Sequence, residues 1–262
     1  MAVTFITGGA GAIGRACARA LARDGWKVVL ADIDGDEVHR VAAGFRAQEI
    51  AGVFVLDVTD FDAVHSAVAQ AAKTNRGLQG LVTAAGGARG IAGSSKVPFI
   101  DTTPETWGAM IEVHLNAVYY TCHAILPVFY AGGGGAIVNI ASGAGLRGGP
   151  PHLRQRHASV YSAAKAGVIA LTQSIAQEAG PKGVRANCVA PGRTESRSKS
   201  WEEMECLQRE EEVPHPGSGR TSPLGRFGRA SDMGEAVAFL MSERAGYITG
   251  ACLDVTGGIR MH

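Results

Sequence analysis

A tyrosine and a lysine four residues apart are the residues of this chain whose types and spacing most directly suggest chemistry. They are Tyr161 and Lys165, in the sequence YSAAK. Residues four apart lie on one face of a helix, so both side chains can point the same way. A free tyrosine, with a pKa near 10, is a poor base at neutral pH. A neighbouring ammonium favours the phenolate and lowers that pKa, so the spacing predicts a tyrosine that exchanges a proton near about pH 7–8.

A YxxxK pair alone occurs often by chance, and an exposed pair on a helix surface is the plain alternative. It becomes specific beside a dinucleotide site, which a second motif predicts. The sequence TGGAGAIG, Thr7–Gly14, lies between a short β-branched run and a segment with the apolar period of a helix. Glycines there let the backbone approach a pyrophosphate, and the helix N-terminus offers N–H groups and a positive dipole. A simple tight turn would use the same glycines, so the strand before and the helix after give the motif its weight.

Two acidic residues stand at the ends of the next expected strands. Asp32 ends the run KVVLAD, and Asp57 with Val58 ends GVFVLDV. A carboxylate at Asp32 can accept hydrogen bonds from both ribose hydroxyls of NAD and would repel the 2′-phosphate of NADP. The alternative for Asp32 is a helix cap or a solvated strand end. Asp57 could bind the adenine amino group with Val58 against the ring, or could, with Thr59 and Asp60, only cap the next helix.

Strand and helix patterns alternate along the whole chain. Strands are expected over residues 2–7, 27–33, 52–58, 78–86, 135–142, 184–191 and 250–258, and helices over 12–25, 35–48, 60–73, 104–130, 159–180 and 232–243. The strands are nearly continuous apolar runs, as they are when both faces of a sheet are covered. The pattern predicts an α/β fold: one domain over residues 1–262, a Rossmann-type doubly wound parallel sheet with helices on both faces.

Composition excludes several classes of partner. The chain has 262 residues, of which 46% are hydrophobic and 19% charged, and this predicts a soluble globular protein. Its formal net charge of +1 argues against nucleic acid or an anionic membrane as a partner. The five cysteines lack metal-site spacing, so we expect reduced thiols, no metal and a cytoplasmic location. No apolar run is long enough to span a bilayer, and no signal peptide precedes the turn that begins at Gly8.

Together these motifs closely resemble those of the short-chain dehydrogenase/reductase family, and the resemblance covers nearly the whole chain. The most similar group is the bacterial one that includes β-ketoacyl carrier-protein reductases and sugar or polyol dehydrogenases. The residues that carry the resemblance are TGGAGAIG, Asp32, TAAG at Thr83–Gly86, Asn116, IVNIASGAG with Ser142, YSAAK, NCVAPG at Asn187–Gly192, PLGRFGR and YITGACLDVTGG.

The resemblance implies a catalytic tetrad. Tyr161 would be the general acid/base, Lys165 would lower its pKa and bind the nicotinamide ribose, and Ser142 would hydrogen-bond the substrate oxygen. Asn116 would bend its helix and hold a water that relays protons from Lys165, whereas His114 is expected to be a packed helix histidine. An NAD site is also implied, with Pro191, Gly192 and the Thr194 backbone beside the carboxamide. Its residues would be Gly8, Gly11, Ala12, Ile13, Gly14, Asp32, Ile33, Asp57, Val58, Ala85, Gly86, Tyr161, Lys165, Pro191, Gly192 and Thr194.

The chain departs from the family pattern in three places. Ala12 stands where a glycine is often found, which the family tolerates. Thr83-Ala84 replaces a usual pair of Asn residues, so a structural hydrogen bond to the central sheet is either lost or remade by Thr83. The interval from Ser142 to Tyr161 is several residues longer than usual, and the excess is an insert within residues 150–157.

The insert would stand at the mouth of the substrate pocket, facing a polar segment, residues 193–223, which we interpret as a substrate lid. Arginines in and around these segments could bind an anionic substrate, or could be solvated or contact a neighbouring subunit. The arginines are Arg147, Arg154, Arg156, Arg193 and Arg197, with His152 and His157 in the insert.

These observations predict an NAD(H)-dependent oxidoreductase that interconverts a secondary alcohol and a ketone. Its substrate would be a small sugar, polyol or hydroxy-acid-like molecule, and the resemblance implies a homotetramer. A β-ketoacyl-thioester reductase is the alternative enzyme, and Asp32 argues against the NADPH preference common in that role. A nucleotide-sensing scaffold on the same fold is the non-enzymatic alternative, and the intact tetrad argues against it.

Overall fold

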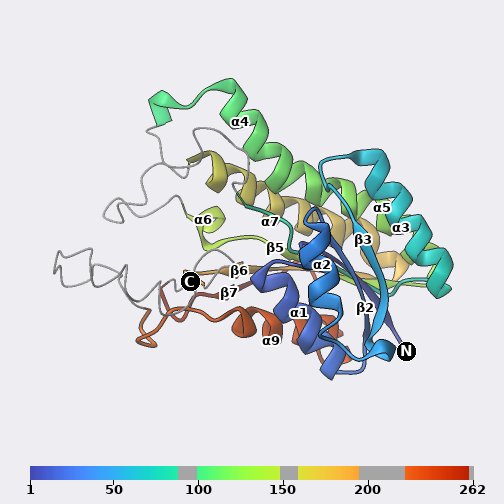
Figure 1. Ribbon diagram of the computed structural model, residues 1–262. Coiled ribbons are helices and arrows are strands. Elements are labelled where there is room, and N and C mark those ends of the chain that lie inside the picture. The colour runs from blue at the N-terminus through green and yellow to red at the C-terminus, as the bar shows by residue number, and fades with distance from the viewer. Residues whose placement is uncertain (88–98, 148–158, 195–221, 260–262) are drawn as a thin grey trace.

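Seven parallel strands form one sheet in the computed structural model, which describes residues 1–87, 99–147, 159–194 and 222–259 (Figure 1). The strand order is β3-β2-β1-β4-β5-β6-β7. The strands are β1 Val3–Thr7, β2 Lys27–Asp32, β3 Ile50–Val55, β4 Gly80–Thr83, β5 Gly135–Ile140, β6 Val184–Pro191 and β7 Cys252–Val255. The order reverses direction between β1 and β4, and in such sheets the crevice for a ligand opens at the carboxyl ends of the strands on either side of the reversal.

Helices cover both faces of this sheet (Figure 1). One layer holds α1 Ala12–Arg23, α2 Gly35–Ala42 and α9 Ala230–Met241. The other holds α3 Phe61–Asn75, α5 Ala117–Gly132 and α7 Ser159–Ala179, with α4 Pro104–Ile111 beside α7. The short helix α6, Gly143–Leu146, follows β5 directly and packs against α7. The prediction of a doubly wound α/β sheet is therefore confirmed.

Neighbouring residues of each central strand enter opposite hydrophobic cores. In β1, Phe5 packs into the core under α3, α5 and α7, whereas Ile6 packs into the core under α1, α2 and α9. Both side chains are completely buried. Successive side chains of a strand point to opposite faces, so a strand covered on both faces needs an uninterrupted apolar run. The apolar runs expected from the sequence follow from this geometry.

Two expected helices differ from the observed ones. The helix expected over residues 35–48 ends at Ala42, and residues 47–49 form a 3-10 turn before β3. The helix expected over residues 104–130 is interrupted by a π-helical turn, Glu112–Asn116, between α4 and α5. A π turn contains one residue more than an α turn, so it changes which side chains face the sheet from that point onward.

A buried polar network connects the centre of the sheet with α7. The Thr83 hydroxyl donates to Asn139 Oδ1 at 2.8 Å, and Asn139 Nδ2 donates to Thr172 Oγ1 at 2.9 Å. All three residues are buried. Thr83 thus makes the structural hydrogen bond to the central sheet that the replacement of the usual asparagine pair put in doubt. The network fixes β4, β5 and α7 relative to one another.

The cysteines Cys17, Cys122, Cys188 and Cys252 carry free thiols, and Cys206 lies outside the described residues. Among the described helices, none combines the length and apolarity that crossing a bilayer requires. The insert at residues 150–157 and nearly all of the expected lid at 193–223 also lie outside the described part of the chain.

Removing the Thr83 hydroxyl should destabilise the fold, whereas removing the Thr4 hydroxyl should not. Thr83→Val leaves buried Asn139 without its Thr83 donor, and we expect the free energy of unfolding to fall by about 1–3 kcal/mol. Thr4 Oγ1 is buried and has no hydrogen-bond partner within the described residues, so Thr4→Val should be neutral or stabilising. Urea denaturation of both variants measures the difference. Equal effects would show that the network does not stabilise the sheet.

Candidate active site

The glycine turn between β1 and α1 brings backbone unusually close to backbone. Gly8 has φ +67°, and a Cβ built on it would lie 2.5 Å from the Ala85 nitrogen. A Cβ on Gly14 would overlap the Gly8 carbonyl oxygen. Helix α1 begins at Ala12, and no side chain caps it at Gly11. Uncapped N–H groups at a helix N-terminus, beside a turn made mostly of glycines, fit the pyrophosphate of a dinucleotide.

Asp32 stands at the end of β2, across this turn. Its Oδ2 accepts a hydrogen bond from the Ala10 N–H at 3.0 Å, and its Oδ1 accepts one from the Asp34 N–H at 3.1 Å. The carboxylate therefore braces the glycine turn as well as standing at the crevice edge. The next residue, Ile33, is 60% exposed, so it offers an apolar surface there. The structure brings both residues to the edge where a ribose and a base would bind.

Asp57 and Val58 follow β3 in a turn. Asp57 Oδ1 accepts hydrogen bonds from both the N–H and the hydroxyl of Thr59, at 2.9 Å and 2.7 Å. The residue that caps α3 is Asp60, which accepts a hydrogen bond from the Ala63 N–H at 2.9 Å. Asp57 thus stabilises the turn that precedes the helix cap. This local structural role is close to the second interpretation given above, in which Asp57 helps to cap the next helix. A contact from Asp57 to adenine stays a prediction.

The remaining predicted cofactor residues also lie at the carboxyl edge. Gly86 follows β4, and a Cβ on it would lie 3.3 Å from the ring of His114. At the end of β6, Pro191 is followed by Gly192, whose N–H donates to the Val255 carbonyl at 3.0 Å. The Thr194 hydroxyl donates to the Gly192 carbonyl at 3.2 Å. These two hydrogen bonds thus hold the segment after β6 in place beside the crevice.

Ser142, Tyr161 and Lys165 meet at the end of β5. Ser142 follows that strand by two residues, and its hydroxyl, which accepts from the Ala144 N–H at 3.1 Å, also hydrogen-bonds the Tyr161 phenol. Lys165 is buried, and its Nζ donates to the Ile140 carbonyl at 2.8 Å. Gly145 makes this approach possible, because a Cβ there would lie 2.6 Å from the Lys165 carbonyl carbon.

The pKa of Tyr161 corrects one expectation. Burial raises the pKa of the phenol above its ordinary value of 10, and the hydrogen bond with Ser142 offsets part of this rise. A pKa near 7–8 is therefore not found in this structure. Lys165 Nζ lies 6.0 Å from the centre of the Tyr161 ring and is bound to the Ile140 carbonyl. Burial also lowers the pKa of Lys165 to about 8, so the ammonium is itself easily discharged.

Asn116 is engaged away from this pair. Its Nδ2 donates to Glu112 Oε2 at 2.6 Å, one turn earlier in the same helix. The ring that faces Tyr161 belongs to His114, with ring centres 4.9 Å apart and planes at 90°. The catalytic role of Asn116 stays a prediction that this contact disfavours. No sequence pattern indicated His114, because the π turn that presents it leaves no mark on an apolar helical period.

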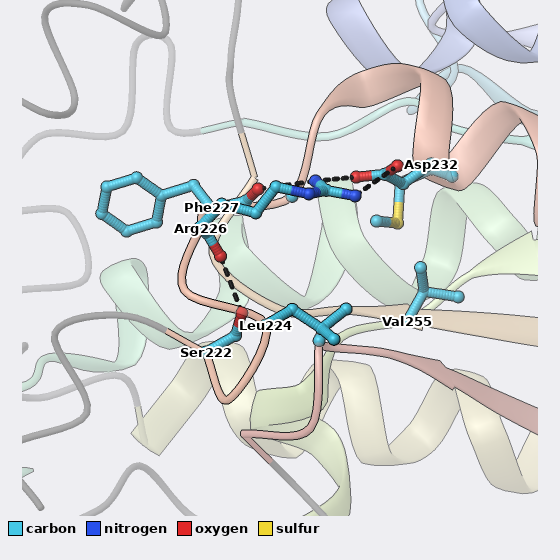
Figure 2. A pocket seen from close by; sticks show the side chains of 9 residues that line it. Ser222, Leu224, Arg226, Phe227, Asp232 and Val255 are labelled. Atoms are coloured by element: carbon cyan, nitrogen blue, oxygen red, sulfur yellow. Dashed lines mark hydrogen bonds and ion pairs between the residues drawn. The ribbon is translucent and has the colours of Figure 1, made fainter.

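A separate hollow of about 210 Å³ lies between the segment after residue 222 and α9 (Figure 2). Figure 2 shows its main polar groups paired with one another, Arg226 with Asp232 at 2.6 Å and 3.0 Å and Ser222 with the Arg226 carbonyl at 2.8 Å. The Gly228 N–H, at its rim, donates to the Arg193 carbonyl at 2.8 Å. The hydrogen bonds among the residues that line this hollow therefore hold the chain after β6 in place. None of Ser142, Tyr161 and Lys165 lines it.

Within the described ranges, no three His, Cys, Asp or Glu side chains gather as they would around a metal ion. The arginines expected near the substrate are only partly described. Arg193 holds its guanidinium 5.8 Å from the centre of the Phe227 ring. Arg147 follows α6 and is exposed. Arg154, Arg156, Arg197, His152 and His157 lie outside the described residues.

Known proteins resemble this chain along nearly its whole length. A family model described as enoyl-(acyl carrier protein) reductase matches residues 8–260. The 2-dehydro-3-deoxy-L-rhamnonate dehydrogenase (NAD(+)) of Sphingomonas sp. (strain SKA58) is 34% identical, over 97% of this chain and 93% of that protein. The cis-4-hydroxycyclohexanecarboxylate dehydrogenase of Sinomonas cyclohexanicum is 35% identical, over 98% and 95%. The crystal structure of gox2181 has a TM-score of 0.81 and 29% identity, over 98% and 95%.

Replacing Lys165 by an apolar residue of similar length should stabilise the fold at neutral pH. The pKa of Lys165 is about 8 in the folded protein against an ordinary value of 10.5. A pKa lowered that far corresponds to about 3 kcal/mol against the folded state while the lysine is charged. Lys165→Met also loses the bond to the Ile140 carbonyl, so we expect a net gain of about 1–3 kcal/mol below pH 8.

The gain should shrink as pH rises from 8 to 10.5. In that range the unfolded chain still holds a proton that the folded wild type has released, so wild-type stability increases with pH. Urea denaturation of wild type and Lys165→Met at pH values below and above this range measures the change. Lys73→Met, at an exposed lysine of α3, is the control. A stability difference that does not vary with pH would contradict the buried charge.

Proposed function

The chain belongs to the short-chain dehydrogenase/reductase family, and we propose that it is an NAD(H)-dependent oxidoreductase interconverting a secondary alcohol and a ketone. One observation carries the proposal. Ser142, Tyr161 and Lys165 meet at the same edge of the sheet as the glycine turn and Asp32. A proton-transfer group and a dinucleotide cradle on one crevice are what hydride transfer requires.

In the oxidation direction, Tyr161 would accept the proton of the substrate hydroxyl. Ser142, which already hydrogen-bonds the phenol, would hold the same oxygen while it becomes a carbonyl. Bound NAD⁺ supplies the acceptor for the hydride that leaves the carbinol carbon. Lys165, with a pKa of about 8, would take up or release a proton near the working pH and stabilise the phenolate when charged.

The residues of the glycine turn would hold the pyrophosphate through backbone N–H groups, and Asp32 would accept hydrogen bonds from the adenosine ribose. Asp32 already accepts two backbone hydrogen bonds, from Ala10 and Asp34, so its carboxylate is fixed before a ribose arrives. A carboxylate accepts about four hydrogen bonds, which leaves capacity for ribose hydroxyls. The 2′-phosphate of NADP would meet the same negative charge at close range.

We further propose that the substrate is a hydroxy acid. Two relatives carry names of carboxylate substrates, a deoxy-rhamnonate and a hydroxycyclohexanecarboxylate. Arg193 follows Gly192 at the end of β6, and Arg147 follows the short helix α6 after Ser142, so both arginines belong to segments that leave the carboxyl edge of the sheet. A guanidinium binds a carboxylate through two parallel hydrogen bonds. The resemblance also supports a homotetramer, the scattered cysteines without metal-site spacing support a cytoplasmic location, and the polar composition of residues 193–223 supports a substrate lid.

The alternative enzyme is a β-ketoacyl-thioester reductase, which relatives named 3-oxoacyl-[acyl-carrier-protein] reductase favour. Asp32 speaks against it, because a carboxylate at that place disfavours the NADPH on which such a reductase commonly depends. A nucleotide-sensing scaffold would bind the dinucleotide without turnover. Activity assays with an alcohol, a hydroxy acid and a β-ketoacyl thioester, each with both cofactors, separate the three.

Asp32 should make NAD the preferred cofactor by at least about tenfold in kcat/KM, because its charge repels a 2′-phosphate. Asp32→Asn keeps an oxygen that can accept one of the two backbone hydrogen bonds and removes the charge. We expect that variant to use NADP better and NAD worse than wild type does. Kinetics with both cofactors measure the change, and the melting temperature controls for damage to the turn. A wild-type preference for NADP would overturn the role of Asp32.

Tyr161→Phe should lower kcat by at least about a thousandfold while NADH still binds, because the phenol acts on the proton and not on the dinucleotide. Since burial raises the pKa of Tyr161, wild-type kcat/KM for oxidation should climb with pH through and beyond the neutral range. Steady-state kinetics from pH 6 to 10 and NADH fluorescence titration test both points. Near-normal turnover by Tyr161→Phe would refute the mechanism, and a flat pH profile would refute a rate limited by this base.

A further inference from the structure

Two histidines from different helices bring their ring nitrogens together on the outer surface of α3 and α5. His65 lies on α3 and His123 on α5, and the two helices pack side by side over the same face of the sheet (Figure 1). His123 Nδ1 and His65 Nε2 are 3.1 Å apart. The ring centres are 5.1 Å apart, and the ring planes meet at 51°. The two residues are 58 positions apart in the sequence, so the local spacing behind the expectation of no metal could not reveal the pair.

Helix packing explains why the two rings meet at the surface. On α3, Val64 is buried in the core, and His65, the next residue, is half-buried at the edge of that buried stripe. On α5, Cys122 is buried and His123 beside it is exposed. Both histidines therefore lie at the outer margin of the contact between the helices, where their rings reach each other and still meet solvent.

Aromatic side chains hold both imidazoles in place. The ring centre of Phe61, which begins α3, is 4.3 Å from that of His65 and 5.7 Å from that of His123. The Tyr119 ring of α5 lies 5.6 Å from the His123 ring. Residues four apart share a helix face, so each helix supplies one aromatic ring and one imidazole to this cluster. Rings held in this way lose less freedom on binding a ligand than unsupported surface side chains would.

The distance between the two nitrogens suits a shared metal ion. Zinc binds imidazole nitrogen at about 2.0–2.1 Å with tetrahedral angles, which places two ligand nitrogens about 3.3 Å apart. The observed separation of 3.1 Å is close to that value. Without a metal, one ring would donate its N–H to the bare nitrogen of the other. With a metal, each neutral ring turns its bare nitrogen to the ion and carries its N–H on the other nitrogen.

We propose that His65 and His123 bind a divalent transition metal ion of the zinc, nickel or copper class, and that this ion links α3 to α5. Imidazole suits these ions, whereas Mg²⁺ and Ca²⁺ take oxygen ligands. Water completes the coordination, because no third His, Cys, Asp or Glu side chain joins the pair in the part of the chain that the structure describes. The inference does not depend on the proposed oxidoreductase function, since the resting protein binds the ion.

Metal binding to the purified full chain without an affinity tag tests the site. Ni²⁺ is the first probe, because free thiols compete more strongly for zinc. Isothermal titration calorimetry should show that wild type binds Ni²⁺, binds Cu²⁺ more tightly and does not bind Mg²⁺. His65→Gln and His123→Gln should each weaken Ni²⁺ binding at least about tenfold. His39→Gln removes an exposed histidine of α2, on the other face of the sheet, and as the matched control should bind as wild type does.

Two further readouts identify the ligands and the effect of the ion. The electron paramagnetic resonance spectrum of bound Cu²⁺ should show coupling to two imidazole nitrogens in wild type and to one in either variant. At a Ni²⁺ concentration about a hundredfold above Kd, the melting temperature of wild type should rise by at least about 5 °C. The rise should be clearly smaller in His65→Gln and His123→Gln, because an ion held by one helix no longer links the two.

Several outcomes would overturn the inference. Ni²⁺ affinity that is unchanged in both variants would place the bound ion elsewhere, and loss in only one variant would contradict an ion shared by two ligands. An equal loss in His39→Gln would show binding to any surface histidine. Absence of binding to wild type would leave a hydrogen bond between the rings as their only interaction. If a variant does not fold, the nitrogen coupling of Cu²⁺ in wild type decides, and coupling to fewer than two nitrogens refutes the site.

Discussion

The site depends on one buried hydrogen bond, from the Lys165 ammonium to the Ile140 carbonyl at the end of β5. That carbonyl belongs to the residue two before Ser142, so a single strand end sets the positions of both groups. Helix α7 must approach the strand closely for the bond to form, and Gly145 of α6 permits this because it has no side chain. Four residues before Lys165, Tyr161 is then delivered to the Ser142 hydroxyl. The geometry of the cluster formed by Ser142, Tyr161 and Lys165 thus follows from how one helix packs on one strand.

A second connection prevents that packing from slipping. Asn139, one residue before Ile140, joins Thr83 of β4 to Thr172 of α7 through buried hydrogen bonds. Breaking such a bond leaves a polar atom without a partner in the core, which is costly, so the three elements move as a unit. Thr83 is also followed by the Ala84–Gly86 segment, against which His114 lies. The cofactor side and the proton side of the crevice are therefore held by the same network.

The sequence allowed much of this arrangement to be predicted, for identifiable physical reasons. Spacing on a helix placed Tyr161 and Lys165 on one face, and the alternation of apolar runs gave the doubly wound sheet, because both are local geometry. The sign of the Tyr161 pKa shift could not be predicted, since it depends on how much protein surrounds the phenol. The π turn could not be predicted either, and with it the contact of the His114 ring with Tyr161. One additional residue in a helical turn changes the facing side chain without changing composition or period.

The pKa values of the three titrating groups of the site are all shifted in the sense that favours the neutral form, which the spacing of the residues alone would not suggest. Burial raises the pKa of Tyr161 and lowers the pKa values of Lys165 and His114, so each group is shifted toward its neutral form. A pocket that disfavours every charge in its resting state has a low local dielectric, and a charge that appears there is poorly screened. The alkoxide or phenolate formed during the reaction would therefore interact strongly with any group that carries a positive charge. Lys165, with its pKa near 8, is poised between its charged and neutral forms, so its protonation and the ionisation of Tyr161 should be coupled rather than independent.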